Sequence, residues 1–224
     1  LMNQAEERYE RVAIVIPCYN ESATLGSIVS ACRRFGTVIV VDDGSSDNSA
    51  EIARQHGGTV VRTTGRTGYD GAIEHGLRTA YSDGFQIIIT IDADGEHDPK
   101  LVKDFIQAHD AGADLVIGIR PKPQRIAEWI VCLFCEYRFG VKDILCGMKG
   151  MTRSVLKLYL SEDHTNLVNT WPALLWRSKN GNLTQIDVTG TPRQDAPRFQ
   201  SLIRANLKIA AMLFTISKLP KPRT

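Results

Sequence analysis

The sequence lacks a long apolar segment. Among its 224 residues the longest uncharged apolar run is IAAMLFTIS at 209–217, far shorter than the roughly 20 residues that a helix needs to cross a bilayer. The opening residues, LMNQAEERYER, also lack the apolar stretch that a secretory signal peptide contains. We therefore expect neither a membrane-spanning helix nor a secretory leader.

Cysteine is scarce and irregularly spaced. The five cysteines do not form the even-numbered framework of a small disulfide-rich domain, so a reducing, cytoplasmic compartment fits better. Cys132 and Cys135 form a CxxC pair, but they lie in an apolar segment and no second pair accompanies them. A structural zinc site needs four ligands, so we interpret both cysteines as core thiols.

The sequence also lacks an excess of charge of one sign. Its 27 basic and 25 acidic residues leave a formal net charge of +2, so no overall field favours nucleic acid as a partner. Hydrophobic residues make up 43% of the chain, and a chain of this length can bury one sizeable core. We expect one domain over residues 1–198 and a C-terminal amphipathic helix with a basic tail over 199–224.

The chain does contain an alternation of strand-like and helix-like segments. Short β-branched runs bounded by turn residues are typical of strands that are buried on both faces. Segments 22–35 and 98–109 carry apolar residues at helical spacing. The strand-like runs lie at 12–16, 37–41, 60–62, 86–91 and 114–119. The alternation predicts an α/β fold with a doubly wound, mostly parallel sheet.

Polar clusters follow three of these predicted strands, with PCYNE at 17–21, DDGSSD at 42–47 and DADGEH at 92–97. Ligands bind beyond the carboxyl ends of the strands in an open parallel sheet, so the clusters should converge on one edge. No GxGxxG follows the first strand, and the glycine-rich segment 64–71 lacks the spacing of a phosphate-binding loop. These absences argue against a dinucleotide-dependent dehydrogenase and against a Walker-type site.

The cluster at 92–97 concentrates carboxylates where a strand leaves the core. Carboxylates held together repel one another, and a divalent cation that prefers oxygen ligands, Mg²⁺ or Mn²⁺, would remove that cost. The alternative is a polar turn that caps the next helix. Asp98 is the better capping candidate, which leaves Asp92 and Asp94 unexplained by a turn alone. We interpret His97 as structural.

The cluster at 42–47 has two interpretations. It is typical of a turn followed by a helix N-cap, and one of Asp42 and Asp43 could also accept hydrogen bonds from a nucleotide base or ribose. The residues that could begin the following helix are Ser45, Ser46 and Asp47.

Two amphipathic stretches lie at 125–137 and 199–218, each with apolar residues on one helical face. In the first stretch these residues are Ile126, Trp129, Ile130, Leu133, Phe134 and Tyr137. In the second they are Phe199, Leu202, Ile203, Ala210, Leu213 and Phe214. Such faces either pack on the sheet or meet a membrane interface.

Five blocks in a fixed order are more specific than any single cluster. IVIPCYNE, VIVVDDGSSDNS, IIITIDADGEHDPK, DLVIGIR and DILCGMKGM follow one another along the chain. In this order and spacing the sequence resembles family 2 glycosyltransferases of the GT-A fold, particularly the dolichol- and polyprenyl-phosphate sugar transferases. The resemblance extends from about residue 11 to about residue 193. It implies a GT-A sheet flanked by helices, and a nucleotide-sugar donor, either GDP-mannose or a UDP-hexose.

The resemblance also implies roles for individual residues. The nucleotide pocket would be formed by Pro17, Tyr19, Glu21, Val41 and Asp43, with Asp92, Ala93 and Asp94 meeting the nucleotide sugar. The metal on the diphosphate would be held by Asp92, Asp94 and Glu96. Arg120 would contact the donor or acceptor phosphate, and Arg193, in a late block, would close over the diphosphate.

Two departures from the family pattern bear on the mechanism. The late block reads RQDAPRF at 193–199, so Ala196 and Phe199 stand where relatives have glycine and lysine. The second departure is Asn169-Thr170-Trp171, where relatives place an acidic residue before the last helix. A sugar hydroxyl needs a general base, whereas a lipid phosphate is already an anion. The pattern therefore favours a polyprenyl or dolichyl phosphate acceptor.

A lipid acceptor implies a membrane surface as a partner, which agrees with the two amphipathic stretches. We expect a cytoplasmic protein, peripheral on the inner face of the membrane, with an anchor supplied by a partner subunit. Transfer to a glycan or protein hydroxyl and a non-catalytic binding subunit remain as alternatives. A nucleotidyltransferase is disfavoured because its glycine-rich, lysine-bearing signature near the first strand is missing.

Overall fold

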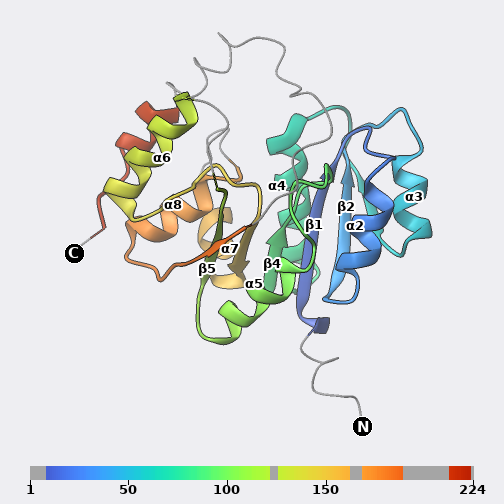
Figure 1. Cartoon of the computed structure of the whole chain (residues 1–224), viewed down its shortest axis with the longest axis horizontal. Helices are drawn as coiled ribbons and strands as arrows, with labels where there is room; N and C mark the ends of the chain where they lie inside the picture. Colours follow the sequence, from blue (N-terminus) through green and yellow to red (C-terminus); the bar gives the residue numbers. More distant parts are fainter. Residues whose placement is uncertain (1–8, 122–125, 162–167, 189–211, 223–224) are drawn as a thin grey trace.

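The computed structural model describes residues 9–121, 126–161, 168–188 and 212–222. These residues form three layers, in which a central sheet lies between two layers of helices (Figure 1). Within the described ranges no helix is both long enough and apolar enough to span a membrane.

The sheet has seven strands in the order β3-β2-β1-β4-β6-β5-β7. All neighbouring pairs are parallel except those of β6, which runs antiparallel to β4 and to β5. The strands are β1 (Val12–Cys18), β2 (Thr37–Asp42), β3 (Thr59–Arg62), β4 (Ile87–Thr90), β5 (Leu115–Ile119), β6 (Lys149–Thr152) and β7 (Thr184–Asp187). The mostly parallel α/β fold and all five strands predicted from the sequence are confirmed. The short strands β6 (KGMT) and β7 (TQID) carry polar residues and gave no strand signal.

The helices cover both faces of the sheet, because the strands alternate their side chains between two apolar clusters. Val12, Ile14 and Ile16 of β1 pack with α2 and α5, whereas Ala13 and Val15 pack with α4, α7 and α8. The helices are α2 (Leu25–Cys32), α3 (Ser49–Gln55), α4 (Gly68–Ser82), α5 (Leu101–Asp110), α6 (Ile126–Phe139), α7 (Arg153–Leu160) and α8 (Trp171–Ser178). This two-sided burial explains the unbroken apolar runs of the sequence.

The predicted helices at 22–35 and 98–109 are present as α2 and α5, with shorter or shifted ends. A carboxylate oxygen of Asp98 accepts a hydrogen bond from the backbone N–H of Lys100 at 2.9 Å, directly before α5. Asp98 therefore holds the turn before α5, whereas the N-cap residue itself is Lys100, which has no side-chain cap hydrogen bond.

The sheet brings the predicted clusters to one edge. Cys18 and Asp42 are register partners at the carboxyl ends of β1 and β2. On the other side of β1, Val15 pairs with Thr90, the last residue of β4. Because β6 is antiparallel, its first residue, Lys149, also pairs with Thr90. The start of β6 therefore lies at the same edge as the ends of the parallel strands.

Helix α6 is apolar on two sides. Val131, Cys135 and Phe139 are buried in the core. On the face predicted from the sequence, Trp129 and Tyr137 are exposed by 54% and 80%, whereas Phe134 packs partly buried against the core. Cys132 and Cys135 are buried free thiols, as predicted for core positions, and burial raises the pKa of Cys135 to about 12.

Residues 212–217 form a helical turn that packs beside α6 (Figure 1). Met212 and Ile216 are buried there, and Arg138 of α6 donates a hydrogen bond to the carbonyl of Leu219 at 2.5 Å. Phe214, on the predicted apolar face, is 66% exposed. The proposed domain boundary at 198/199 lies outside the described residues.

Candidate active site

The loops after β1 and β2 are fastened to each other by hydrogen bonds. The backbone N–H of Asn20 donates to the hydroxyl of Ser45 at 3.0 Å, and the N–H of Ser46 donates to the side-chain oxygen of Asn20 at 2.8 Å. Asp47 accepts from the N–H of Ser49, the first residue of α3, at 3.0 Å. Asp47 also accepts from the N–H of Ser22 at 3.1 Å, so all three residues considered for the start of this helix hold the loop after β1, and the N-cap of α3 is Asn48.

Asp42 has a structural role. Its buried carboxylate accepts from the N–H of Ser45 at 2.8 Å and pairs with the guanidinium of Arg62 at 2.8 Å. Burial alone would raise its pKa, but the hydrogen bonds from Ser45 and Arg62 outweigh burial and lower the pKa below its usual value. Of the two adjacent aspartates, Asp42 is therefore the structural one.

Asp43 holds the glycine-rich segment. Its carboxylate is only 3% exposed and accepts from the backbone N–H groups of Thr67 and Gly68, both at 2.7 Å. The hydroxyl of Thr63 lies 2.9 Å from the same carboxylate. Gly68 has φ +78°, a conformation that favours glycine, where its N–H meets Asp43. Burial would raise the pKa of Asp43, but these hydrogen bonds lower it.

The residues implied for the nucleotide pocket differ in accessibility. Val41 is fully buried and is the register partner of Pro17, which is buried as well. Tyr19 and Glu21 lie in the loop after β1 and are partly exposed. The guanidinium of Arg66 lies 4.0 Å from the centroid of the Tyr19 ring. Sequence reasoning missed Arg66, which offers a cation beside this pocket.

Asp92 and Asp94 follow β4 and are both partly exposed. Asp94 accepts from the backbone N–H of Glu96 at 3.0 Å. Asp92 accepts from the hydroxyl of Tyr69 at 2.9 Å, and a Cβ at Gly147 would overlap its carboxylate. Position 147 therefore requires glycine for Asp92 to keep its place.

The donor set suits a hard divalent cation, because Asp92 and Asp94 present carboxylate oxygens at an accessible edge. Within the described residues, no three His, Cys, Asp or Glu side chains gather closely enough to hold a metal ion. The implied trio with Glu96 does not close into a complete protein site. A cation here would take further ligands from a bound diphosphate.

Lys149 is a charged residue of this edge that sequence reasoning missed. It is 1% exposed, and its ammonium group donates a hydrogen bond to the backbone carbonyl of Cys146. Burial lowers the pKa of Lys149 below its usual value, although the charges of Asp143 and Asp92, among others, act to raise it. The signal in the sequence was its position in the DILCGMKGM block, where a single lysine interrupts apolar residues.

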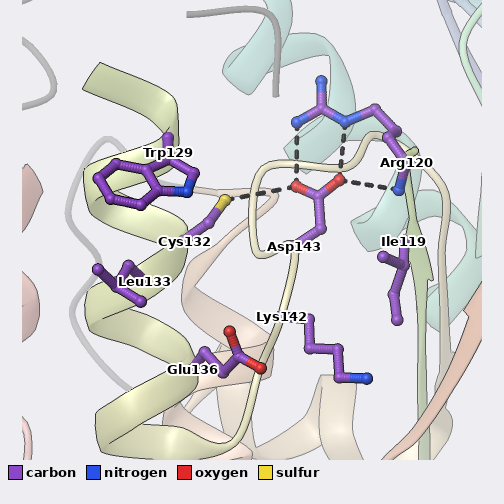
Figure 2. A pocket seen from close by; sticks show the side chains of 8 residues that line it. All are labelled: Ile119, Arg120, Trp129, Cys132, Leu133, Glu136, Lys142 and Asp143. Carbon is purple, nitrogen blue, oxygen red and sulfur yellow. Dashed lines mark hydrogen bonds and ion pairs between the residues drawn. The ribbon is translucent and has the colours of Figure 1, made fainter. Parts of the chain in front are cut away.

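Arg120 forms a bidentate ion pair with Asp143 (Figure 2). Its Nε donates to one carboxylate oxygen of Asp143 at 2.8 Å and a terminal nitrogen donates to the other at 3.0 Å. Burial would raise the pKa of Asp143, but Arg120 lowers it below its usual value. Arg120, which the sequence predicts to contact a phosphate, is thus held in a fixed orientation by Asp143.

A shallow pocket of about 120 Å³ lies between this pair and α6 (Figure 2). Its wall combines the charged pair with exposed apolar side chains of α6. The lining residues are Ile119, Arg120, Trp129, Cys132, Leu133, Glu136, Lys142 and Asp143.

His97 is buried behind the acidic residues. Its Nε2 lies 3.9 Å from a carboxylate oxygen of Asp92 and 3.9 Å from the sulfur of Cys146. This enclosure agrees with the structural interpretation. Arg193 and the rest of the late block, with Ala196 and Phe199, lie outside the described residues.

Comparison with known proteins gives one consistent family. The sequence pattern of the family described as "Glycosyl transferase family 2" matches residues 13–128. A polyprenol monophosphomannose synthase of Mycolicibacterium smegmatis is 30% identical over 213 residues, which cover 83% of this chain and 79% of that protein. An undecaprenyl-phosphate mannosyltransferase of Micrococcus luteus is 29% identical over 168 residues, 66% of this chain and 68% of that protein. Matches to several uncharacterised relatives cover about half of their length.

Among solved structures, glucosyl-3-phosphoglycerate synthase from Mycobacterium tuberculosis, in complex with Mn²⁺ and UDP-glucose, superimposes with a TM-score of 0.78. The match covers 99% of this chain and 86% of that one at 19% identity, so it establishes the fold. Residues 13–128, which match the family's sequence pattern, contain strands β1 to β5 apart from Val12, and the carboxylates after β2 and β4. The chain belongs to glycosyltransferase family 2 and is an enzyme with the GT-A fold.

Proposed function

We propose that this enzyme transfers a sugar from a nucleotide-diphosphate donor to a polyprenyl phosphate. The observation that carries the proposal is the combination of Asp92 and Asp94 after β4 with an amide, Asn169, in the segment 169–171, where the family resemblance implies an acidic residue. The names of the two curated relatives, which concern polyprenyl phosphates, support the same acceptor.

The nature of residue 169 favours a phosphate acceptor. An amide cannot accept a proton at neutral pH, so Asn169 cannot serve as a general base. His97, the histidine next to the acidic residues, is 1% exposed. A phosphate oxygen needs no deprotonation before it attacks. A lipid phosphate therefore suits this site better than a glycan or protein hydroxyl.

The reaction would be an in-line attack of a phosphate oxygen on the anomeric carbon, with inversion. The bond between the sugar and the nucleoside diphosphate breaks, and the diphosphate leaves with its electron pair. Mg²⁺ or Mn²⁺, when bound, neutralises charge on the departing diphosphate. Asp92 and Asp94 would hold the donor with its cation, and Glu96 would assist. Arg193 would close over the diphosphate.

Arg120 would contact the acceptor phosphate. Asp143 fixes its guanidinium in one orientation, which lowers the entropy lost on binding an anion. The neighbouring pocket has apolar walls from Trp129 and Leu133, which suit the first prenyl units of a lipid. The head group and the chain of one acceptor could thus be bound side by side.

The exposed face of α6 would meet the membrane surface. Of the six exposed large apolar side chains in the described residues, five lie on α6 or at Phe214 beside it, and Lys218 and Lys221 accompany them. Apolar residues flanked by lysines bind at interfaces with anionic lipids. A cytoplasmic, peripheral position on the inner face of the membrane, with a partner subunit as an anchor, belongs to the same proposal.

A donor screen tests the proposed reaction. Purified protein with Mn²⁺ or Mg²⁺ and undecaprenyl phosphate would be incubated with each of a panel of GDP- and UDP-sugars, and release of the nucleoside diphosphate would be recorded. We expect release from one donor, dependent on the lipid phosphate and abolished by Asp94→Ala. The matched control, Asp104→Ala, removes an exposed carboxylate on α5 and should retain activity. Lipid-independent transfer, or transfer to a glycan hydroxyl alone, would refute the proposed acceptor.

A further inference from the structure

The hydroxyl of Tyr69 bridges two residues from distant parts of the chain. It lies 2.9 Å from Oδ1 of Asp92, in the loop after β4, and 3.3 Å from the side-chain nitrogen of Asn169, in the segment before α8. In the proposed function Asp92 binds the donor, and Asn169 lies in the segment 169–171, where the family resemblance implies an acidic residue. The contact therefore connects both residues on which the proposed function depends.

The chemistry of the three groups fixes the direction of the hydrogen bonds. A carboxylate can only accept, so the single hydroxyl proton of Tyr69 points to Asp92. The amide NH₂ of Asn169 donates to the oxygen of Tyr69. An ionised acid at position 169 would compete with Asp92 for the Tyr69 proton. The amide removes that competition.

Asn169 is held as a buried group. It is 6% exposed, and its NH₂ group donates to the hydroxyl of Tyr69 at 3.3 Å. The contact with Tyr69 is therefore made by an amide that is almost fully enclosed by the fold.

Tyr69 and Asp92 are also held from their other sides. Tyr69 directly follows Gly68, whose backbone N–H donates to the buried Asp43 at 2.7 Å. The carboxylate of Asp92 rests against the backbone at Gly147, where no side chain would fit. The hydrogen bond at 2.9 Å therefore joins two anchored segments rather than two free side chains.

We propose that Tyr69 is a positioning residue, which fixes the carboxylate of Asp92 for binding a divalent cation with the donor diphosphate, and that Asn169 holds Tyr69 in this role. The inference rests on the proposed donor site but not on the identity of the acceptor. It also assigns a function to the glycine-rich segment. Asp43 holds this segment in place, and the segment in turn places Tyr69 against Asp92.

The direct test is Mn²⁺ binding, measured by electron paramagnetic resonance of free Mn²⁺ in the presence of UDP or of GDP. Tyr69→Phe keeps the ring and removes the hydroxyl. We expect its affinity for Mn²⁺ with the nucleotide to fall by about tenfold, as is typical when a partner behind a metal ligand is lost. Tyr81→Phe, at the other end of the same helix α4, is the matched control and should bind as the wild type does.

Asn169→Leu provides a second variant, because leucine has a similar size and cannot donate. We expect a loss of about fivefold in Mn²⁺ affinity, as for one neutral hydrogen bond. In the Tyr69→Phe background the same substitution should have no further effect, since both act through one hydroxyl. A merely structural role of Asn169 would give additive losses in the double variant.

The outcomes separate this inference from the proposed function. Wild-type affinity in Tyr69→Phe, or additive losses in the double variant, would overturn the role of Tyr69 and leave the transfer to lipid phosphate untouched. Tyr69-dependent Mn²⁺ binding without lipid-dependent transfer would support the role and reject the acceptor. Absence of Mn²⁺ binding to the wild type with either nucleotide would overturn the inference.

Discussion

Two adjacent aspartates at the end of β2 show how surroundings assign different tasks to the same residue type. Asp42 faces Arg62 and the turn at Ser45, and it holds the end of the strand. Asp43 faces the backbone of Thr67 and Gly68, and it holds the segment that carries Tyr69. Both carboxylates are buried, and in both the hydrogen bonds to the ionised form outweigh the cost of burial.

The lowered pKa of Asp43 gives a prediction for stability against pH. Asp43→Asn loses hydrogen bonds to a charged acceptor, so we expect the free energy of unfolding at pH 7 to fall by about 2 kcal/mol. A depressed folded-state pKa stabilises the protein fully above the unfolded value, about 3.9. This contribution disappears as the pH falls through the folded-state pKa. Urea denaturation of both proteins from pH 7 downward measures the difference.

The control for this experiment is Asp83→Asn, which changes an exposed aspartate after α4. Its free energy of unfolding should stay within about 0.5 kcal/mol of the wild type at every pH, as is usual for exposed positions. A difference between wild type and Asp43→Asn that persists unchanged at pH 3 would show that the charge of Asp43 is not what holds the segment.

Among the helices, α6 departs most from the pattern of a surface helix. One side packs in the core through Val131, Cys135 and Phe139, whereas Trp129 and Leu133 stay exposed by 54% and 50%. Soluble proteins rarely expose contiguous apolar patches without a function. The sequence predicted an apolar face that includes Trp129 and Leu133 but left its direction open, because either a sheet or a membrane could cover it. It did not predict the second side, which packs in the core.

Removing apolar groups from this face tests the proposed membrane contact. We expect Trp129→Ser combined with Leu133→Ser to lower the partition coefficient onto vesicles with anionic lipid by about tenfold or more. Each side chain would contribute on the order of 1 kcal/mol when its exposed part enters the interface. Sedimentation with sucrose-loaded vesicles measures the bound fraction.

The matched control is the double variant Glu51→Ser and Gln55→Ser on α3, at the far end of the molecule from α6 (Figure 1). Its vesicle binding should remain that of the wild type. Equal binding by the α6 variant and the wild type would mean that another surface, or a partner subunit, meets the membrane.

At the scale of the whole molecule, strand order decides which residues meet. The central position of β1 and β4 brings the loops that follow β1, β2 and β4 together. The antiparallel β6 then adds Lys149 from about sixty residues further along the chain. The site is therefore distributed over elements that only the folded sheet joins, so ligand binding should stabilise the whole domain.

Thermal unfolding measures that coupling. At a ligand concentration about 100 times its dissociation constant, binding to the folded state adds about 2.7 kcal/mol. For a chain of 224 residues this corresponds to a rise in Tm of roughly 5–10 °C. We expect Mn²⁺ with either UDP or GDP, but not both equally, to produce this rise, and Asp94→Ala to abolish it. Equal small shifts with both nucleotides and with the variant would indicate non-specific binding.

The sequence by itself determined the α/β class, the five strands β1 to β5 and the cluster at 92–97, because these are local properties. Strands buried on both faces must be apolar throughout, and polar residues directly after them lie at the carboxyl edge. The order of the blocks also indicated the family, which the comparisons confirmed.

Only the tertiary structure decided which polar residue faces which. β6 carries a lysine and a glycine, and its strand character comes from pairing with β4 and β5 rather than from its own composition. Asp42 and Asp43 are indistinguishable in the sequence, yet their hydrogen-bond partners lie about twenty residues away. Tyr69 and Asn169 meet across 100 positions. Such contacts depend on how the sheet is assembled, and no local pattern of residues encodes them.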